Sequence, residues 1–192
     1  MDRSITASAV RKLTLAPLLA AVMLIYLYAV QPGIFGSVRM LFQQLLFLSL
    51  FPLLAYPVQP LIPAFRNKGR DGQRHLAMIF AFVGYLLTCI LNVYADASKE
   101  LCLIGWVYLL SGITILTLNC LCKLRVSGHT AGVGAVMSLS IALGHPNALI
   151  VSFPLLYLVC WASITTKRHT IPQLIGGTLV PTALTVLLTS IR

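Results

Sequence analysis

The sequence predicts an all-α integral membrane protein, a polytopic bundle of six or seven transmembrane helices. Of its 192 residues, 58% are hydrophobic and 9% are charged, whereas about a quarter of the residues in a soluble domain are charged. The mean hydropathy is +0.91, and the apolar residues form runs near the length of about 20 residues that a helix needs to cross a bilayer. A single transmembrane domain is therefore expected over residues 1–192, with a short polar N-terminus at residues 1–12.

Seven apolar runs are candidate membrane helices. In chain order they are Leu13–Val30, Met40–Ile62, Leu76–Ala95, Leu101–Cys122, His129–Leu143, Asn147–Thr165 and Pro172–Ile191. The first follows Arg11 and Lys12 as in a signal peptide, but it is longer than a typical signal-peptide core and has no clear cleavage site. The fifth is the shortest and ends at the predicted turn Leu143–Asn147, because Pro146 disfavours helix at the residue before it. A hairpin of two helices is expected there.

The charges are distributed unevenly along the chain. Fourteen Lys and Arg residues against four Asp and Glu give a formal net charge of +10. If the seven runs cross in turn, the second, fourth and sixth connections share a face with the N-terminus, and eleven of the fourteen cations lie there. The positive-inside rule would make this face cytoplasmic, and binding of an anion would also place cations on it. Nucleic acid is not expected as a partner, because the cations are divided among short loops without interleaved aromatic residues.

The orientation in the membrane depends on the second run, which contains Pro52, Pro57 and Pro60. If that run does not cross as one span, the N-terminus changes sides while the three cation-rich loops stay together. The grouping of these loops is therefore predicted independently of the orientation.

Three loops on the cation-rich face contain similar sets of basic and polar residues. Their polar residues are Arg66, Lys68, Arg70 and Arg74 in the first loop, Arg125, Ser127 and His129 in the second, and Lys167, Arg168 and His169 in the third. Two helices separate each successive pair of loops, so all three can converge at one end of a bundle. Lys, Arg, Ser and backbone amides suit a phosphate group, and a helix that starts near Gly128 would point N–H groups at it. Gly128, Gly132 and Gly134 would permit close backbone approach.

These residues resemble the type 2 phosphatidic acid phosphatase superfamily, whose three signatures are K-x6-R-P, P-S-G-H and S-R-x5-H-x3-D. The second signature is similar to Ser127–Gly128–His129, with Val126 where proline is usual. The third is similar around His169, which lies four residues before Gln173 and the following LIGG stretch at Leu174–Gly177.

The resemblance spans Arg66 to Gly177, with departures in two signatures. Five residues separate Lys68 from Arg74 in the first signature, and no proline follows. The arginine expected six residues before the histidine of the third signature is Ser163 here, and the aspartate expected four residues after it is Gln173.

The resemblance implies a metal-independent hydrolase of a lipid phosphate or diphosphate that uses no cofactor. His169 would attack phosphorus and form a phosphohistidine, and His129 would protonate the leaving oxygen. The residues that would bind the phosphate are Lys68, Arg74, Arg125, Ser127, Gly128, Lys167 and Arg168. Independently of the family, an imidazole can act as nucleophile or acid near neutral pH, and cations neutralise charge on a transferring phosphoryl group. With four acids in the chain, a Mg²⁺ site is not expected.

The departures leave a second function open. Gln173 would orient the His169 ring by accepting a hydrogen bond, but without the charge of an aspartate, and Lys167 or Arg168 would replace the missing arginine. The alternative is a catalytically impaired relative that binds or transports phospholipid. Candidate substrates are polyprenyl diphosphate, phosphatidic acid, phosphatidylglycerol phosphate and a phosphorylated glycolipid. The small size indicates a multi-pass protein of the bacterial cytoplasmic (inner) membrane, whose other partners are membrane lipids and whose oligomeric state is left open.

Overall fold

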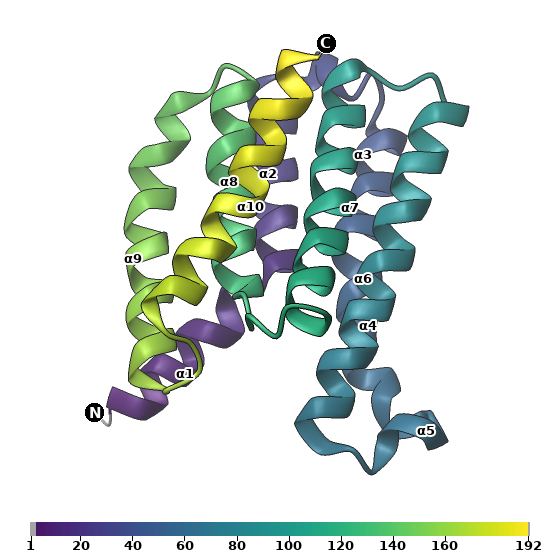
Figure 1. Ribbon diagram of the computed structural model, residues 1–192. Helices are drawn as coiled ribbons and strands as arrows, with labels where there is room; N and C mark the ends of the chain where they lie inside the picture. The colour runs from purple at the N-terminus through teal and green to yellow at the C-terminus, as the bar shows by residue number, and fades with distance from the viewer. Residues whose placement is uncertain (1–2, 192) are drawn as a thin grey trace. The chain divides into compact units, whose positions relative to one another are not determined.

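The computed structural model describes residues 3–191, and within that range all regular structure is helical (Figure 1). The α-helices are α1 (Arg3–Leu13), α2 (Ala16–Val30), α3 (Val38–Leu45), α4 (Phe51–Val58), α5 (Pro63–Arg66), α6 (Gly69–Tyr94), α7 (Lys99–Cys120), α8 (Gly128–Ala142), α9 (Leu149–Thr165) and α10 (Ile171–Ser190). Shorter elements are η1 (Pro32–Ile34), η2 (Leu46–Leu50), η3 (Gln59–Leu61) and η4 (Pro146–Ala148). The predicted all-α class is confirmed.

Five stretches of these helices are long and apolar enough to cross a membrane. They are Val38–Leu61, Gly69–Tyr94, Lys99–Cys120, Pro146–Thr165 and Ile171–Ser190. Helices α1 and α2 meet at a bend of 54° and would add a sixth span if they cross as one. Helix α8 has 15 residues and is therefore about 22 Å long, less than the bilayer core of about 30 Å. The described residues thus contain five candidate membrane spans, or up to six, as expected of an integral membrane protein.

The prolines of the second predicted run do not interrupt it. The helix continues from α3 through the π-helical turn η2 and α4 to η3. Proline cannot donate the backbone hydrogen bond of a helix, and the π-helical turn directly before Pro52 accommodates it. Gly84 of α6 packs against the carbonyl oxygen of Phe47 in this turn, where a side chain would not fit. This run is one candidate span.

The chain divides into two compact units. The middle unit comprises Ala20–Gly112, and the terminal unit comprises Met1–Leu19 with Ile113–Arg192. In the middle unit, the rings of Tyr85 and Tyr108 pack edge to face with centroids 5.5 Å apart. The Asn92 side chain donates to the Leu101 carbonyl at 3.0 Å. Such interhelical polar contacts stabilise helix association in lipid, where there is no water to satisfy buried polar groups.

Helix α8 is the most buried helix of the terminal unit and packs against α9 and α10 (Figure 1). Its small residues allow this packing. A Cβ atom on Gly132 would lie 2.7 Å from the Cβ of Ala16, and one on Gly134 would lie 2.7 Å from the carbonyl oxygen of Thr178. Gly132 and Gly134 therefore serve helix packing, whereas a Cβ on Gly128 would have open space around it. The close backbone approach expected at Gly132 and Gly134 is therefore made by neighbouring helices, which fill the space beside them.

The N-terminal ends of α8 and α10 are joined by two hydrogen bonds. The Ser127 amide donates to the carbonyl of Gln173 at 3.1 Å, and the Thr130 hydroxyl donates to the carbonyl of Leu174 at 2.9 Å. Gly177 lies against the Ser127 carbonyl and the Thr130 hydroxyl, so close that a side chain would collide with both. Both helices therefore begin at the same end of the terminal unit, in direct contact.

The paired glycines Gly176 and Gly177 test this junction. We expect Gly177→Ala to lower the free energy of unfolding by about 1–3 kcal/mol, because its Cβ would push α8 and α10 apart. Gly176→Ala is the matched control, since its Cβ would meet the Val126 side chain at an ordinary 3.7 Å, and alanine favours a helix by up to about 1 kcal/mol over glycine. Thermal unfolding in detergent would measure both. Equal stability of the two variants would contradict this account of the junction.

Candidate functional site

The loop between α7 and α8 is held in place by Asn119. The Val126 amide donates to the Asn119 side-chain oxygen at 2.5 Å, and the Asn119 amide group donates back to the Val126 carbonyl at 3.3 Å. The Leu124 amide donates to the carbonyl of Leu118 at 3.1 Å. Asn119 was not among the predicted site residues. The signal that could have identified it was an amide side chain near the end of a long apolar run.

Three basic residues beside this site have left-handed backbone. The φ angles are 54° at Lys123, 52° at Arg125 and 51° at Lys167. This conformation costs a residue with a side chain about 1–2 kcal/mol and persists where the surroundings enforce it. Lys123 and Arg125 belong to the loop that Asn119 holds, and Lys167 belongs to the loop between α9 and α10. At Arg125 the result is a carbonyl group directed at His169.

The imidazole of His169 is oriented by two oxygen atoms. Its Nδ1 lies 3.1 Å from the Arg125 carbonyl oxygen and 3.3 Å from Oε1 of Gln173. A carbonyl oxygen can only accept, so Nδ1 carries a proton and a neutral ring has its lone pair on Nε2. The Thr170 amide also donates to Gln173 Oε1 at 3.1 Å, within a capping box at the start of α10. Gln173 therefore presents its oxygen to His169, which is the orienting contact that the sequence predicted.

His129 lies in the first turn of α8 and contacts the end of α1. Its Nε2 donates to the carbonyl oxygen of Arg11 at 3.0 Å. The side chain of Ser127 is fully buried, and its hydroxyl caps α8 by accepting from the Thr130 amide at 3.4 Å. Ser127 thus builds the helix end, while Gly128 is exposed there.

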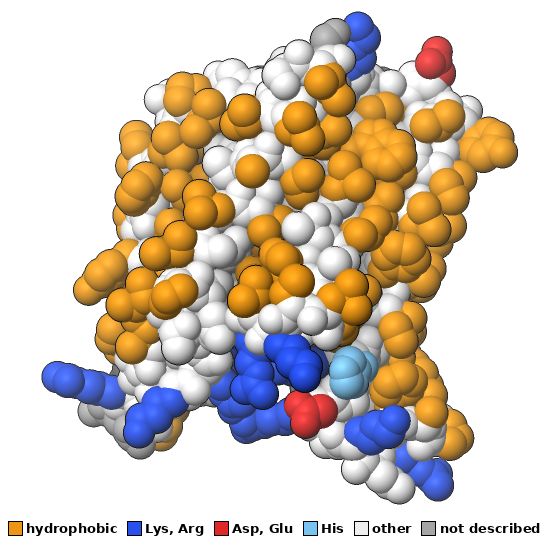
Figure 2. All heavy atoms as spheres, in the orientation of Figure 1, with side chains coloured by type: hydrophobic (Ala, Val, Ile, Leu, Met, Phe, Trp, Pro, Cys, Tyr) orange, Lys and Arg blue, Asp and Glu red, His pale blue; other side chains and the backbone are white. Residues whose placement is uncertain are grey.

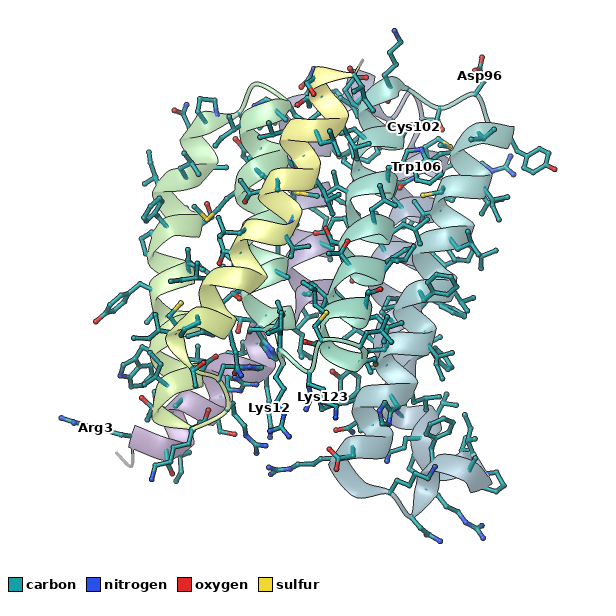
Figure 3. The ribbon with its side chains drawn as sticks, viewed as in Figure 1. Arg3, Lys12, Asp96, Cys102, Trp106 and Lys123 are labelled. Carbon is teal, nitrogen blue, oxygen red and sulfur yellow. The ribbon has the colours of Figure 1, made fainter. Side chains whose placement is uncertain are left out.

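The electrostatic character of this region is strongly positive. The N-termini of α8 and α10 lie side by side, and each carries partial positive charge from its backbone N–H groups. The exposed cations around them are Lys123, Arg125, Lys167 and Arg168. The described residues of the terminal unit, 3–19 and 113–191, contain no Asp or Glu. Figure 2 shows Lys and Arg side chains at the end of the terminal unit where these loops lie, and Figure 3 shows Lys12 and Lys123 at that end.

The terminal unit brings together the second and third predicted motifs but not the first. Arg125, Ser127, Gly128 and His129 contact or adjoin the segment from Lys167 to Gln173 through the hydrogen bonds given above. Lys68 and Arg74 belong to the middle unit, where both are exposed. The Lys68 ammonium lies 5.5 Å from the centroid of the Phe65 ring.

An apolar groove of about 380 Å³ opens between α9 and α10. Its lining residues are Leu156, Cys160, Ile164, Ile171, Leu174, Ile175, Thr178 and Leu179. The groove includes Ile171, two residues after His169, so it reaches the end of α10 at which the histidine lies.

Within residues 3–191, no group of three or more His, Cys, Asp or Glu side chains is placed to hold a metal ion. No protein-family model, curated protein or solved structure matches this chain. The likeness to type 2 phosphatidic acid phosphatases therefore rests on the motif residues themselves.

The loop held by Asn119 gives a test of how this region is built. We expect Asn119→Leu to lower the free energy of unfolding by about 1–3 kcal/mol, because the Val126 amide and carbonyl lose their partner. Thr117→Val is the control, since Thr117 is exposed on the same helix. Hydrogen exchange should become faster over residues 121–128 in the Asn119 variant and stay unchanged in the control. Unchanged exchange in both would show that other contacts fix the loop.

Proposed function

We propose that this protein hydrolyses the phosphate or diphosphate ester of a membrane lipid through a phosphohistidine at His169. The observation that carries the proposal is the orientation of His169: its Nδ1–H faces the Arg125 carbonyl and Gln173, beside the N-terminus of α8 that bears His129. A histidine held by Nδ1–H has Nε2 as its nucleophilic atom. Enzymes catalyse phosphoryl transfer mainly by positioning the reacting groups and by electrostatic stabilisation, and an oriented imidazole with cations nearby would supply both.

The proposed reaction has two steps. In the first, Nε2 of neutral His169 attacks phosphorus, the bond between phosphorus and the lipid oxygen breaks, and protonated His129 gives its proton to that oxygen. In the second, water attacks the phosphohistidine, His129 takes a proton from the water, and the phosphorus–nitrogen bond breaks to release inorganic phosphate. His129 thus serves as acid and then as base, and both imidazoles return to their starting states.

Positive groups would stabilise the transferring phosphoryl group. The first-turn amides of α8 and α10, including that of Gly128, supply partial charge, and Arg125, Lys167 and Arg168 supply full charges nearby.

The groove between α9 and α10 supports a lipid substrate over a soluble one. It reaches the end of α10 at which His169 lies, and all but one of its lining residues are apolar. A hydrocarbon tail in this groove would leave its phosphate at the loops. Polyprenyl diphosphate, phosphatidic acid, phosphatidylglycerol phosphate and a phosphorylated glycolipid share this combination of tail and phosphate. The site is proposed to work in a bacterial cytoplasmic (inner) membrane.

One observation favours a second candidate function, the binding or transport of phospholipid without hydrolysis. The side chain that faces Nδ1 of His169 is the neutral amide of Gln173, which stabilises a charged imidazole less than a carboxylate does. The presence of two histidines at the paired helix ends favours hydrolysis, because a binding site needs cations more than imidazoles.

Phosphate release from a panel of lipid phosphates and diphosphates, in detergent and without added metal, tests the enzyme. We expect His169→Ala to lower release by roughly a thousandfold or more and His129→Ala by roughly a hundredfold to ten-thousandfold. His75→Ala is the control, because His75 is an exposed histidine of the middle unit. An acid-labile phosphate on His169 should be detectable by mass spectrometry. Folded wild-type protein that binds these lipids without releasing phosphate would favour the second candidate.

Filling the groove tests the lipid tail. We expect Ile175→Trp to raise KM for a long-chain lipid phosphate about tenfold, the effect of losing the burial of about two methylene groups. Hydrolysis of a short, water-soluble phosphate ester should not change. Val186→Trp is the control, since Val186 is exposed on the same helix and does not line the groove. An equal effect on both substrates would argue that the tail does not occupy this groove.

A further inference from the structure

Helix α1 contributes to the site, although the sequence indicated only a short polar N-terminus. It runs from Arg3 to Leu13, packs against α9 and bends by 54° into α2 (Figure 1). Arg11 and Lys12 lie in its last turn. This geometry brings the end of α1 to the end of the terminal unit at which α8 and α10 begin.

Arg11 contacts His129 and the end of α9, which precedes the loop of His169. Its carbonyl oxygen accepts from His129 Nε2 at 3.0 Å, and its Nη1 donates to the Ser163 hydroxyl at 2.8 Å. Ser163 is fully buried near the end of α9, and its carbonyl accepts from the Arg168 amide at 2.9 Å, in the loop that leads to His169. The main chain of Arg11 thus holds the His129 imidazole, and Ser163 holds the Arg11 guanidinium beside the loop that leads to His169.

Burial distinguishes Arg11 from its neighbours. Among the Lys and Arg residues that the structure describes in the terminal unit, Arg11 is half-buried and the others are exposed. A charge that is partly removed from water acts on a nearby anion more strongly than an exposed one. The guanidinium carries five N–H donors in a rigid fork that matches a phosphate group, and the bond to Ser163 holds one edge of it in place.

We propose that the Arg11 guanidinium, positioned by Ser163, binds the substrate phosphate, and that the Arg11 carbonyl orients His129. This rests on the proposed function, because it assigns a residue to the phosphate of the same lipid substrate. Helix α1 would then supply a phosphate ligand to the site, from outside the loops that the sequence indicated.

Binding and turnover should be measured in parallel. The binding probes are uncleavable phosphonate analogues of phosphatidic acid and of a polyprenyl phosphate, and turnover is phosphate release from the matching lipids. We expect Arg11→Gln, which keeps a donor for Ser163 but loses the charge, to weaken analogue binding on the order of tenfold to a hundredfold. Arg11→Lys should recover part of the loss, because ammonium keeps the charge without the fork. Ser163→Ala should weaken binding a few-fold by releasing the guanidinium, roughly as expected for one neutral partner.

Arg3→Ala is the charge-matched control on the same helix. Figure 3 shows Arg3 away from Lys12 and Lys123, at the outer end of α1, and its removal should leave binding unchanged. Added guanidinium, at concentrations far below those that unfold proteins, should restore binding to Arg11→Ala. A merely structural role for Arg11 would not produce this rescue.

The outcomes separate the two proposals. Wild-type binding by folded Arg11→Gln protein would overturn the role of Arg11, and so would an equal loss in Arg3→Ala, which would indicate a general charge effect. Analogue binding that depends on Arg11, without phosphate release, would keep the role of Arg11 in binding and overturn hydrolysis. Wild-type protein that neither binds nor cleaves any of these lipids would overturn both proposals.

Discussion

The site depends on the junction between the first turns of α8 and α10. Two hydrogen bonds connect these helix ends, from the Ser127 amide and from the Thr130 hydroxyl to carbonyls of α10. They form because Gly177 has no side chain to separate the two backbones. The junction sets His129 and His169 at neighbouring helix ends and adds the partial charges of two helices at one place. Asn119 completes it by fixing the loop whose Arg125 carbonyl orients His169.

The small and polar residues around the candidate site also pack the helices against one another, as expected of helices in a membrane. Helices in lipid gain little from burying more apolar surface, so close approach at glycine and interhelical hydrogen bonds hold them together. Gly132, Gly134 and Gly177 serve such contacts, and the Ser127 hydroxyl caps a helix. Gly128 is the glycine of this group with open space beside it. In a membrane protein, the role of a glycine or serine in a sequence motif therefore has to be inferred from the residues that surround it in the structure.

The described part of the terminal unit combines many cations with neutral hydrogen-bond acceptors. Its acceptors toward the two imidazoles are backbone carbonyls and the Gln173 amide. Carbonyl oxygens determine which ring nitrogen carries a proton, but they stabilise an imidazolium less than a carboxylate does. The arrangement thus favours attraction of an anion strongly and activation of histidine more modestly. That balance is the physical basis on which the two proposed functions, hydrolysis and binding without hydrolysis, differ.

The sequence by itself determined the all-α class, the long apolar helices and the location of the basic residues between them, because hydropathy and run length act over neighbouring residues. It also placed His169 four residues from Gln173, a contact within one helical turn that needs no long-range information. It did not determine that the prolines of residues 38–61 leave one continuous helix. Arg11 contacts His129, which is 118 positions away in the sequence, and Ser163, which is 152 positions away. Only the tertiary structure could decide these contacts, since they depend on how α1 bends and packs on α9, and no local pattern in the chain encodes that geometry.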